Sequence, residues 1–204
     1  MHTKIRSQKH YTDHIFQELC LEDAAIAGSE FHGCVFANCS LVESILQQCR
    51  FVDCTFRDCD ASLMQVPDTV FASVQFEDAK VMGVDWAQAD WKAIRLGKPL
   101  AFSHCNISHS TFMGLALEDI EIKDCLALNV DFRRTDLSGA NMRGTDLSET
   151  LFSHTNLTEA DLRGAHNYRI DPSQNTLMGA KFSLPEALAL LYSLDITLTE
   201  EDAR

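Results

Sequence analysis

Residues 130–164 decide the fold, and they read VDFRRTDLSGANMRGTDLSETLFSHTNLTEADLRG. In this stretch a large apolar side chain recurs every five positions. The position two before each of these centres holds Val, Thr or Ala, and the other three positions hold mostly Asp, Asn, Arg, Glu, Gly and Ser. We therefore expect the centre and the small residue before it to point inward, and the polar positions to form solvated turns.

The same five-residue spacing extends through most of the chain. It runs from Phe16 to Leu96, resumes one residue late at Phe102 and continues to Leu162 without a polar centre. An amphipathic helix needs spacings of three and four and a strand needs alternation, so neither template explains the pattern. Large aromatic residues also recur every twenty positions. A period of five nested in twenty predicts a solenoid with four short sides per turn.

The twenty-residue period predicts which residues stack on one another. A single one-residue slip at residues 97–101 would keep the aromatic residues on one face. The column on this Phe/Trp face would be Phe31, Phe51, Phe71, Trp91, Phe112, Phe132 and Phe152. The next face would stack Phe16, Phe36, Phe56, Phe76, Leu96, Leu117, Leu137 and Leu157. Aromatic pairs on successive coils would each add about 0.5–1.5 kcal/mol beyond burial.

Units such as ANMRG at 140–144 and ADLRG at 160–164 resemble the repeat of the pentapeptide-repeat family, which is small-[Asp/Asn]-[Leu/Phe]-polar-Gly. The resemblance covers roughly residues 14 to 182. It implies an all-β fold, a right-handed quadrilateral β-helix whose centre residues stack inside. We expect an N-terminal cap segment at 1–13, the β-helix at 14–166 and a C-terminal cap at 167–204.

The C-terminal cap is expected to contain a short α-helix at about residues 184–194. Ser183 and Glu186 have the spacing of a capping box, and Pro185 is tolerated in a first helical turn. The apolar surface of this segment is larger than a short cap needs, which suggests self-association. The predicted homodimer interface is Leu184, Ala187, Leu188, Leu191 and Leu194. A purely structural plug is the alternative.

Composition excludes several classes of function. No run approaches the eighteen apolar residues of a membrane span, and the N-terminal residues lack the apolar core of a secretion signal, so a cytoplasmic protein without a membrane anchor is expected. Seven of the eight cysteines occupy the inward small position, and their spacing is not that of a zinc site, so we expect no metal and no cofactor. The outward His, Ser and Asp would lie on a convex rod without a cleft, which predicts that the protein is not an enzyme.

The formal net charge is −13, and the acidic residues fall mainly on three of the four expected faces. A negatively charged rod repels nucleic acid and attracts basic protein surfaces. The predicted partner-binding residues are outward carboxylates of the face that follows the Phe/Trp face: Asp58, Glu77, Asp78, Glu118, Asp119 and Asp136. Acidity that serves only solubility is the alternative.

The C-terminal residues sharpen the resemblance. Residues 179–182 and 186–196 are similar to the C-terminal segment of the Qnr quinolone-resistance proteins, and residues 170–175 look like the corresponding segment of the microcin B17 immunity protein. This resemblance implies a tail-to-tail dimer and a DNA mimic that binds DNA gyrase or topoisomerase IV and gives immunity or resistance to topoisomerase poisons.

One departure from that group bears on function. Qnr proteins of Gram-negative bacteria carry projecting loops, whereas a one-residue slip leaves no room for one, so the pattern favours a loopless, immunity-like role over quinolone protection. The alternative function is a general protein-interaction scaffold that docks through the Phe/Trp face or the apolar tail.

Overall fold

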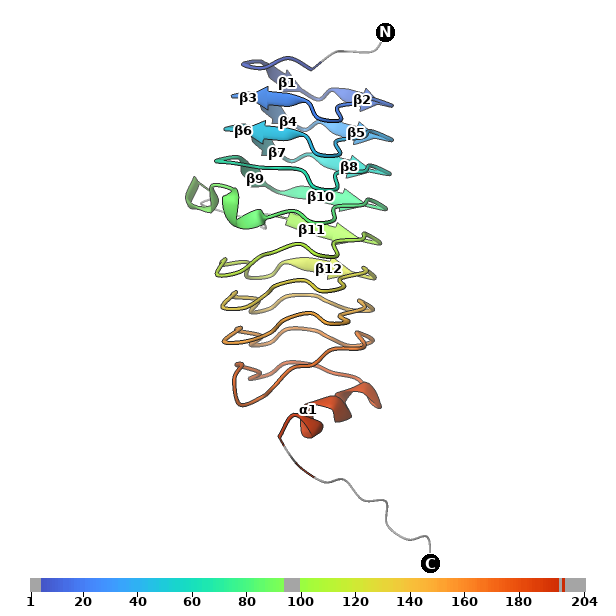
Figure 1. The fold of residues 1–204 in the computed structure, drawn as a ribbon, viewed down its shortest axis with the longest axis vertical. Coiled ribbons are helices and arrows are strands. Elements are labelled where there is room, and N and C mark those ends of the chain that lie inside the picture. Colours follow the sequence, from blue (N-terminus) through green and yellow to red (C-terminus); the bar gives the residue numbers. More distant parts are fainter. Residues whose placement is uncertain (1–4, 94–99, 195, 197–204) are drawn as a thin grey trace, which may run out of the picture.

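The computed structural model describes residues 5–93, 100–194 and 196. The chain winds into an elongated stack of coils, with the N-terminal residues at one end and a short helix at the other (Figure 1). Every strand pairs in parallel with a strand of the next coil. The four-sided β-helix predicted from the sequence is confirmed, and it ends in the predicted short helix.

Three parallel sheets form the regular part of the wall. The four-stranded sheet contains β1 (His10–Thr12), β4 (Glu30–His32), β7 (Arg50–Val52) and β9 (Val70–Ala72). The six-stranded sheet contains β2 (Ile15–Gln17), β5 (Val35–Ala37), β8 (Thr55–Arg57), β10 (Val74–Glu77), β11 (Leu100–Ser103) and β12 (Glu121–Lys123). The two-stranded sheet contains β3 (Ala25–Ala27) and β6 (Ile45–Gln47). Isolated parallel bridges continue these ladders through the later coils.

Each face of the tube is named here after the first residue of its inward column. The Tyr11 face has Tyr11, Phe31, Phe51, Phe71, Leu117, Leu137 and Leu157. The Phe16 face has Phe16, Phe36, Phe56, Phe76, Phe102, Ile122, Met142 and Leu162. The Leu21 face has Leu21, Leu41, Ala61, Val81, Ile107, Ala127 and Leu147, and the Ile26 face has Ile26, Leu46, Val66, Trp86, Phe112, Phe132 and Phe152. The Tyr11 and Leu21 faces are opposite each other.

The five-residue lattice follows from backbone geometry. The centre of nearly every unit is buried, and so is the small residue two positions before it. The residue two positions after the centre turns the corner to the next face with a positive φ, as at Asp53 (52°) and Gly139 (69°). Gly, Asn and Asp adopt this left-handed conformation most readily, which explains their frequency at the corners.

The interruption in the lattice is longer than the predicted one-residue slip. Phe76 pairs with Phe102, and the bridge between Asp85 and Thr111 places Trp86 beside Phe112, so the two coils are offset by 26 residues. The 3-10 turns η1 (Trp86–Gln88) and η2 (Trp91–Ala93) project beyond the outline of the coil (Figure 1). The prediction for residues 97–101 is therefore wrong where it can be compared, because Leu100 already belongs to β11. Leu96 and residues 97–99 lie outside the described residues.

The aromatic side chains form three columns instead of the predicted two. Ring centroids lie 4.7 Å apart for Phe31 and Phe51 and 5.5 Å apart for Phe51 and Phe71 on the Tyr11 face. On the Phe16 face the stacked distances run from 4.4 to 5.2 Å between Phe16 and Phe102. The third column, on the Ile26 face, is Trp86, Phe112, Phe132 and Phe152.

The predicted Phe/Trp column is therefore divided between two faces. Its first three members lie on the Tyr11 face and its last three on the Ile26 face, because the offset of 26 moves every later centre round by one side. Trp91 is half-buried and makes no described ring contact with Phe71, and its Nε1 donates to the carbonyl of Trp86 at 2.8 Å. Within the described residues the stack on the Tyr11 face thus ends at Phe71.

The coil begins earlier and ends later than predicted. Tyr11 stacks on Phe31 at 5.1 Å and Ile5 is part of the core, so residues 5–13 belong to the β-helix. At the other end, parallel bridges continue to Thr176 and Lys181. The boundaries expected at residues 13 and 166 are therefore wrong by several residues.

The C-terminal helix is shorter than predicted: η3 spans Glu186–Leu188 and α1 spans Ala189–Tyr192. No side chain caps η3, so the expected capping box is absent. Instead Ser183 Oγ accepts a hydrogen bond from the Gly164 N–H at 3.2 Å, and Glu186 Oε1 accepts one from the Asn167 N–H at 2.6 Å. In the preceding coil the corresponding N–H groups donate to backbone carbonyls of the next coil. The two side chains therefore replace a coil that is not there.

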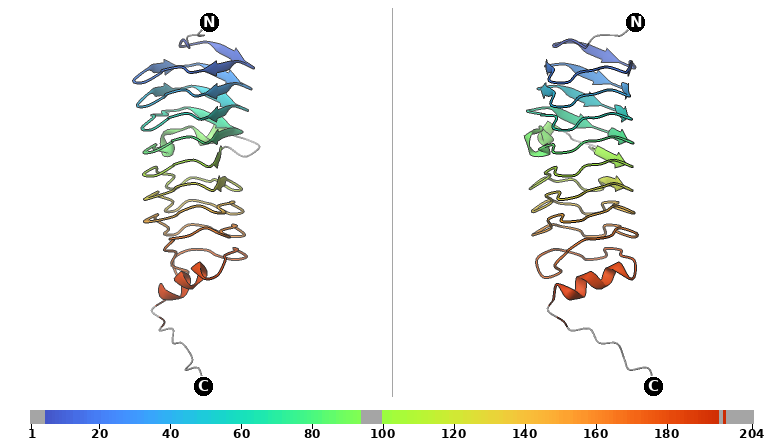
Figure 2. Two further views of the ribbon diagram at one scale, coloured as in Figure 1. Left: turned by 90° about the vertical axis from the view of Figure 1, so that its right-hand side faces the viewer. Right: turned by 45° about the vertical axis from the view of Figure 1, so that its right-hand side comes forward.

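Figure 2 shows that the helix lies across the end of the stack, below the last coil. In the described parts of the chain, no helix has the length and apolar character required to cross a membrane.

Candidate partner-binding surface

The six carboxylates predicted to form one surface lie on two faces. Asp58, Glu77 and Asp78 are on the Phe16 face, in or directly after β8 and β10. Glu118, Asp119 and Asp136 are on the Tyr11 face, beyond the interruption. The prediction that they share a face is wrong, because it assumed an offset of 21 residues where the structure has 26.

The carboxylates of the Phe16 face are partly neutralised by basic neighbours. Arg57 Nη2 lies 2.8 Å from Glu77 Oε2, and Lys123 Nζ lies 2.6 Å from Glu121 Oε2. Arg163 pairs with Asp161 at 2.6 Å, and this hydrogen-bonded guanidinium lowers the pKa of Asp161 to about 2. Exposed ion pairs stabilise a fold only slightly, but they reduce the negative potential of a surface. Along this face the lattice places seven acidic residues against four basic ones.

The Tyr11 face is the most acidic after this correction. Its outward positions hold eight acidic residues against two basic ones. Beyond the interruption they hold Glu118, Asp119, Asp136 and Glu159 and no Lys or Arg. Glu159 was not among the predicted residues. Its lattice position, two after Leu157 as Asp119 is two after Leu117, is the signal that could have found it.

Local contacts fix the orientation of two of these carboxylates. Asp136 Oδ1 accepts hydrogen bonds from the Ser138 N–H and from Asn156 Nδ2, both at 2.9 Å. Burial would raise the pKa of Asp136, but these hydrogen bonds outweigh it and the pKa is lowered. Asp119 lies against Gly139 of the next coil, where an added Cβ would clash with Asp119 Oδ1. Both groups are therefore held in place, and the hydrogen bonds keep Asp136 ionised.

A second acidic row follows the opposite, Leu21 face. Its outward positions hold six acidic residues against one base, Lys80, whose Nζ lies 3.6 Å from Asp60 Oδ2. The Ile26 face is close to neutral, with three acidic and two basic residues, among them the paired Asp131 and Arg133. The expectation of three acidic faces is thus revised to two strongly acidic faces on opposite sides of the tube.

The predicted dimer residues form the outer side of the C-terminal helix. Leu184 is 78% exposed, Leu188, Leu191 and Leu194 are also exposed, and Ala187 is half-buried. On the inner side, Phe182, Ala189 and Leu190 pack against the core. The helix therefore closes the tube with one side and presents an apolar patch with the other. Whether the patch pairs two chains stays a prediction.

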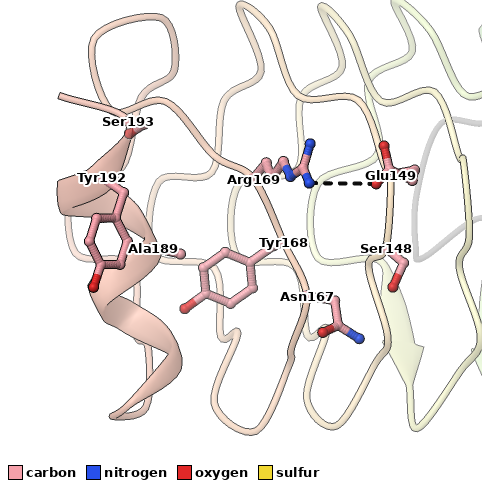
Figure 3. Close-up of a pocket in the computed structure, with 8 residues that line it drawn as sticks. All are labelled: Ser148, Glu149, Asn167, Tyr168, Arg169, Ala189, Tyr192 and Ser193. Atoms are coloured by element: carbon pink, nitrogen blue, oxygen red, sulfur yellow. Dashed lines mark ion pairs between the residues drawn. The ribbon is translucent and has the colours of Figure 1, made fainter. Parts of the chain in front are cut away.

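A groove of about 620 Å³ separates the helix from the last coils. Figure 3 shows Tyr168 pointing from the coil towards the helix, with Tyr192 and Ser193 on the far side and Arg169 paired with Glu149 at 3.8 Å. The Tyr168 hydroxyl is buried without a hydrogen-bond partner among the described residues. Burial and the charge of Glu186 raise its pKa to about 12. In the part of the chain described here, no group of three His, Cys, Asp or Glu side chains is placed to hold a metal ion.

Comparison with protein families decides the classification. A family described as "Pentapeptide repeat region" matches residues 29–99, and "Pentapeptide repeats (8 copies)" matches residues 129–166, which together are more than half of the chain. The chain belongs to the pentapeptide-repeat family. A search of curated proteins finds no match for this pentapeptide-repeat protein.

Solved structures show the same fold. A trypsin-treated variant of QnrB1, described as a plasmid-mediated fluoroquinolone resistance protein, matches with a TM-score of 0.62 and 19% identity over 95% of this chain and 93% of that one. A second trypsin-treated QnrB1 variant matches with a TM-score of 0.61 and 18% identity, covering 94% of this chain and all of the other. At this identity the likeness is one of fold.

Proposed function

We propose that this pentapeptide-repeat protein is a non-enzymatic DNA mimic that acts in the cytoplasm. It binds a bacterial type II topoisomerase, DNA gyrase or topoisomerase IV, and gives immunity or resistance to topoisomerase poisons. The observation that carries the proposal is a rigid rod, of the fold shared with QnrB1, that displays ordered rows of carboxylates. It requires no cofactor and no direct contact with nucleic acid.

Within this proposal, the part of the Tyr11 face beyond the interruption makes the main contact. Its carboxylates Glu118, Asp119, Asp136 and Glu159 have no Lys or Arg among them. Neighbouring coils are about 4.8 Å apart, so Asp119 and Glu159, two coils apart, are separated by roughly 10 Å. Asp58, Glu77 and Asp78 contribute less, because Arg57 neutralises Glu77.

The test is relief of a poisoned supercoiling reaction. Purified gyrase is assayed with a fluoroquinolone and, separately, with a peptide poison, at increasing concentrations of the protein. The test variant carries Glu118→Gln, Asp119→Asn, Asp136→Asn and Glu159→Gln. Amides preserve shape, and Asn and Gln already occupy positive-φ corners at Asn38 and Gln48. We expect at least a tenfold higher concentration for half-maximal relief, equivalent to about 1.4 kcal/mol of binding free energy.

The matched control removes the same four charges from the Phe16 face: Asp58→Asn, Glu77→Gln, Asp78→Asn and Asp124→Asn. We expect it to retain most of the relief. Equal loss in both variants would show that only net charge matters, and unchanged relief in both would refute the electrostatic contact. Binding to gyrase is also expected to weaken with salt, whereas recovery of an unrelated partner at any salt concentration would favour the scaffold alternative.

The interruption removes the earlier argument against quinolone protection. That argument needed a coil without a projection, whereas η1 and η2 project from it. Quinolone protection and peptide immunity are therefore both tested in the assay above.

We further propose that the active form is a homodimer joined through Leu184, Ala187, Leu188, Leu191 and Leu194. Leu188→Asp combined with Leu191→Asp is expected to halve the mass measured by light scattering, because it places carboxylates in the apolar patch. Ile15→Asp, at a residue 71% exposed at the other end of the tube, is the control. An unaltered mass in the double variant would limit the helix to capping.

A further inference from the structure

The inward cysteines are arranged in pairs that the sequence spacing does not reveal. Six of the seven inward thiols lie directly above another thiol on the next coil, twenty residues away. The neighbouring strands are in register, as Val35 with Thr55 shows. The pairs are Cys34 with Cys54, Cys39 with Cys59 and Cys105 with Cys125, and all six side chains are buried. The seventh, Cys49, has Ser29 and Thr69 as its neighbours instead.

The paired thiols contact each other. The Cys105 N–H donates to Cys125 Sγ at 3.4 Å. A hydrogen bond from Cys59 lowers the pKa of Cys39 to about 7, and the same bond together with burial raises the pKa of Cys59. The pKa of Cys105 is lowered in the same way by Cys125. Each of these two pairs therefore shares a proton between two sulfur atoms and releases its first proton readily.

The coil spacing suits an ion held between two sulfur atoms. Adjacent strands are about 4.8 Å apart, and a thiolate–metal bond is about 2.3 Å long. Two sulfurs one above the other are thus separated by about two bond lengths. Thiolates prefer soft ions such as Cu⁺, which accepts two ligands in line. Zn²⁺ needs four ligands, and the described residues offer no cluster of even three His, Cys, Asp or Glu ligands around these pairs.

We propose that each stacked cysteine pair is a two-coordinate site for a soft monovalent cation, Cu⁺ or Ag⁺. Both S–H bonds break, two sulfur–metal bonds form in their place, and the two protons pass to solvent, so no electron is transferred. The bound ion links successive coils. Because the thiols are buried, the ion enters when neighbouring coils separate locally or while the chain folds. This proposal does not depend on topoisomerase binding.

The experiment counts bound ions in a Cys20→Ser background, which removes the exposed thiol. Reduced protein is mixed anaerobically with Cu⁺ supplied by a colorimetric chelator, both in the folded state and during refolding from urea, and native mass spectrometry gives the stoichiometry. We expect three Cu⁺ per chain, two in Cys39→Ala and three in Cys49→Ala. Alanine fits this position, because Ala79 occupies the same inward column between the two pairs.

Circular dichroism confirms folding, and Cys59→Ala provides a second variant that breaks the same pair. X-ray absorption at the copper edge is expected to show two sulfur neighbours at about 2.3 Å. Equal stoichiometry in Cys39→Ala and Cys49→Ala would overturn the proposal. So would the absence of Cu⁺ binding both in the folded protein and after refolding, or Zn²⁺ binding with the same stoichiometry.

Discussion

The contact between Trp86 and Phe112 distinguishes the observed register from the one-residue slip. Trp86 is fully buried, and its ring lies 5.9 Å from Phe112, 5.3 Å from Phe71, 5.8 Å from Phe102 and 6.0 Å from Phe76. Trp91, which the slip would stack on Phe112, is half-buried and makes no ring contact with Phe112 among the described residues. Replacing each tryptophan by leucine therefore has different consequences in the two registers.

The perturbation is a double-mutant cycle of Trp86→Leu with Phe112→Leu, run beside a cycle of Trp91→Leu with Phe112→Leu. Truncating a buried tryptophan to alanine lowers the free energy of unfolding by about 3–5 kcal/mol, and leucine retains part of that volume. The stacked pair itself contributes about 0.5–1.5 kcal/mol, which is the coupling expected between Trp86 and Phe112. For Trp91 and Phe112 we expect additivity within about 0.3–0.5 kcal/mol.

Urea unfolding followed by far-ultraviolet circular dichroism gives the free energies, since the signal does not depend on tryptophan. Leucine is chosen because Leu46 already occupies the column of Trp86. Coupling above about 0.5 kcal/mol between Trp91 and Phe112, with additivity between Trp86 and Phe112, would refute the offset of 26 residues. The assignment of acidic residues to faces would then have to be withdrawn as well.

Two further predictions concern single coils. Gly139→Ala and Gly114→Ala both place a Cβ at positive φ, which costs about 1–2 kcal/mol, but only the Cβ at position 139 meets Asp119 Oδ1, so Gly139→Ala should be the less stable variant in urea, and Asp119→Ala should remove the difference. The pKa of Asp161 is lowered to about 2 by Arg163, below its unfolded value near 3.9, so its contribution to stability is full above about pH 4 and is lost as the pH falls through 2. Arg163→Gln should therefore destabilise the protein at pH 6 and make little difference near pH 2, and an equal effect at both values would contradict this reasoning.

The sequence predicts the tube well but not the rotation of its second half. Centres and small residues recur every five positions because each side of the tube needs one inward pair, so composition alone shows which residues are buried. Offsets of 21 and 26 residues leave the same remainder when divided by five. A lattice of identical units therefore continues in phase after either, and only the contacts of Phe76 with Phe102 and Trp86 with Phe112 distinguish them.

The candidate surface was predicted only in part for the same reason. Each of the six predicted carboxylates lies at an outward position of the lattice, but the rotation separates Glu118, Asp119 and Asp136 from the others. The capping box failed for a different reason. Ser183 and Glu186 have the local pattern, yet the N–H groups of Gly164 and Asn167 lack carbonyl partners at the end of the tube, and they bind these side chains instead.

That closure limits how the protein can assemble. An open end of a parallel coil is a template on which a second chain can add backbone hydrogen bonds, and repetition of that step builds a fibre. Here the amide groups of Gly164 and Asn167 are already occupied by side chains of their own molecule. Growth by strand addition is therefore blocked at these positions, and association at this end has to proceed by apolar side-chain packing, which can stop at two subunits.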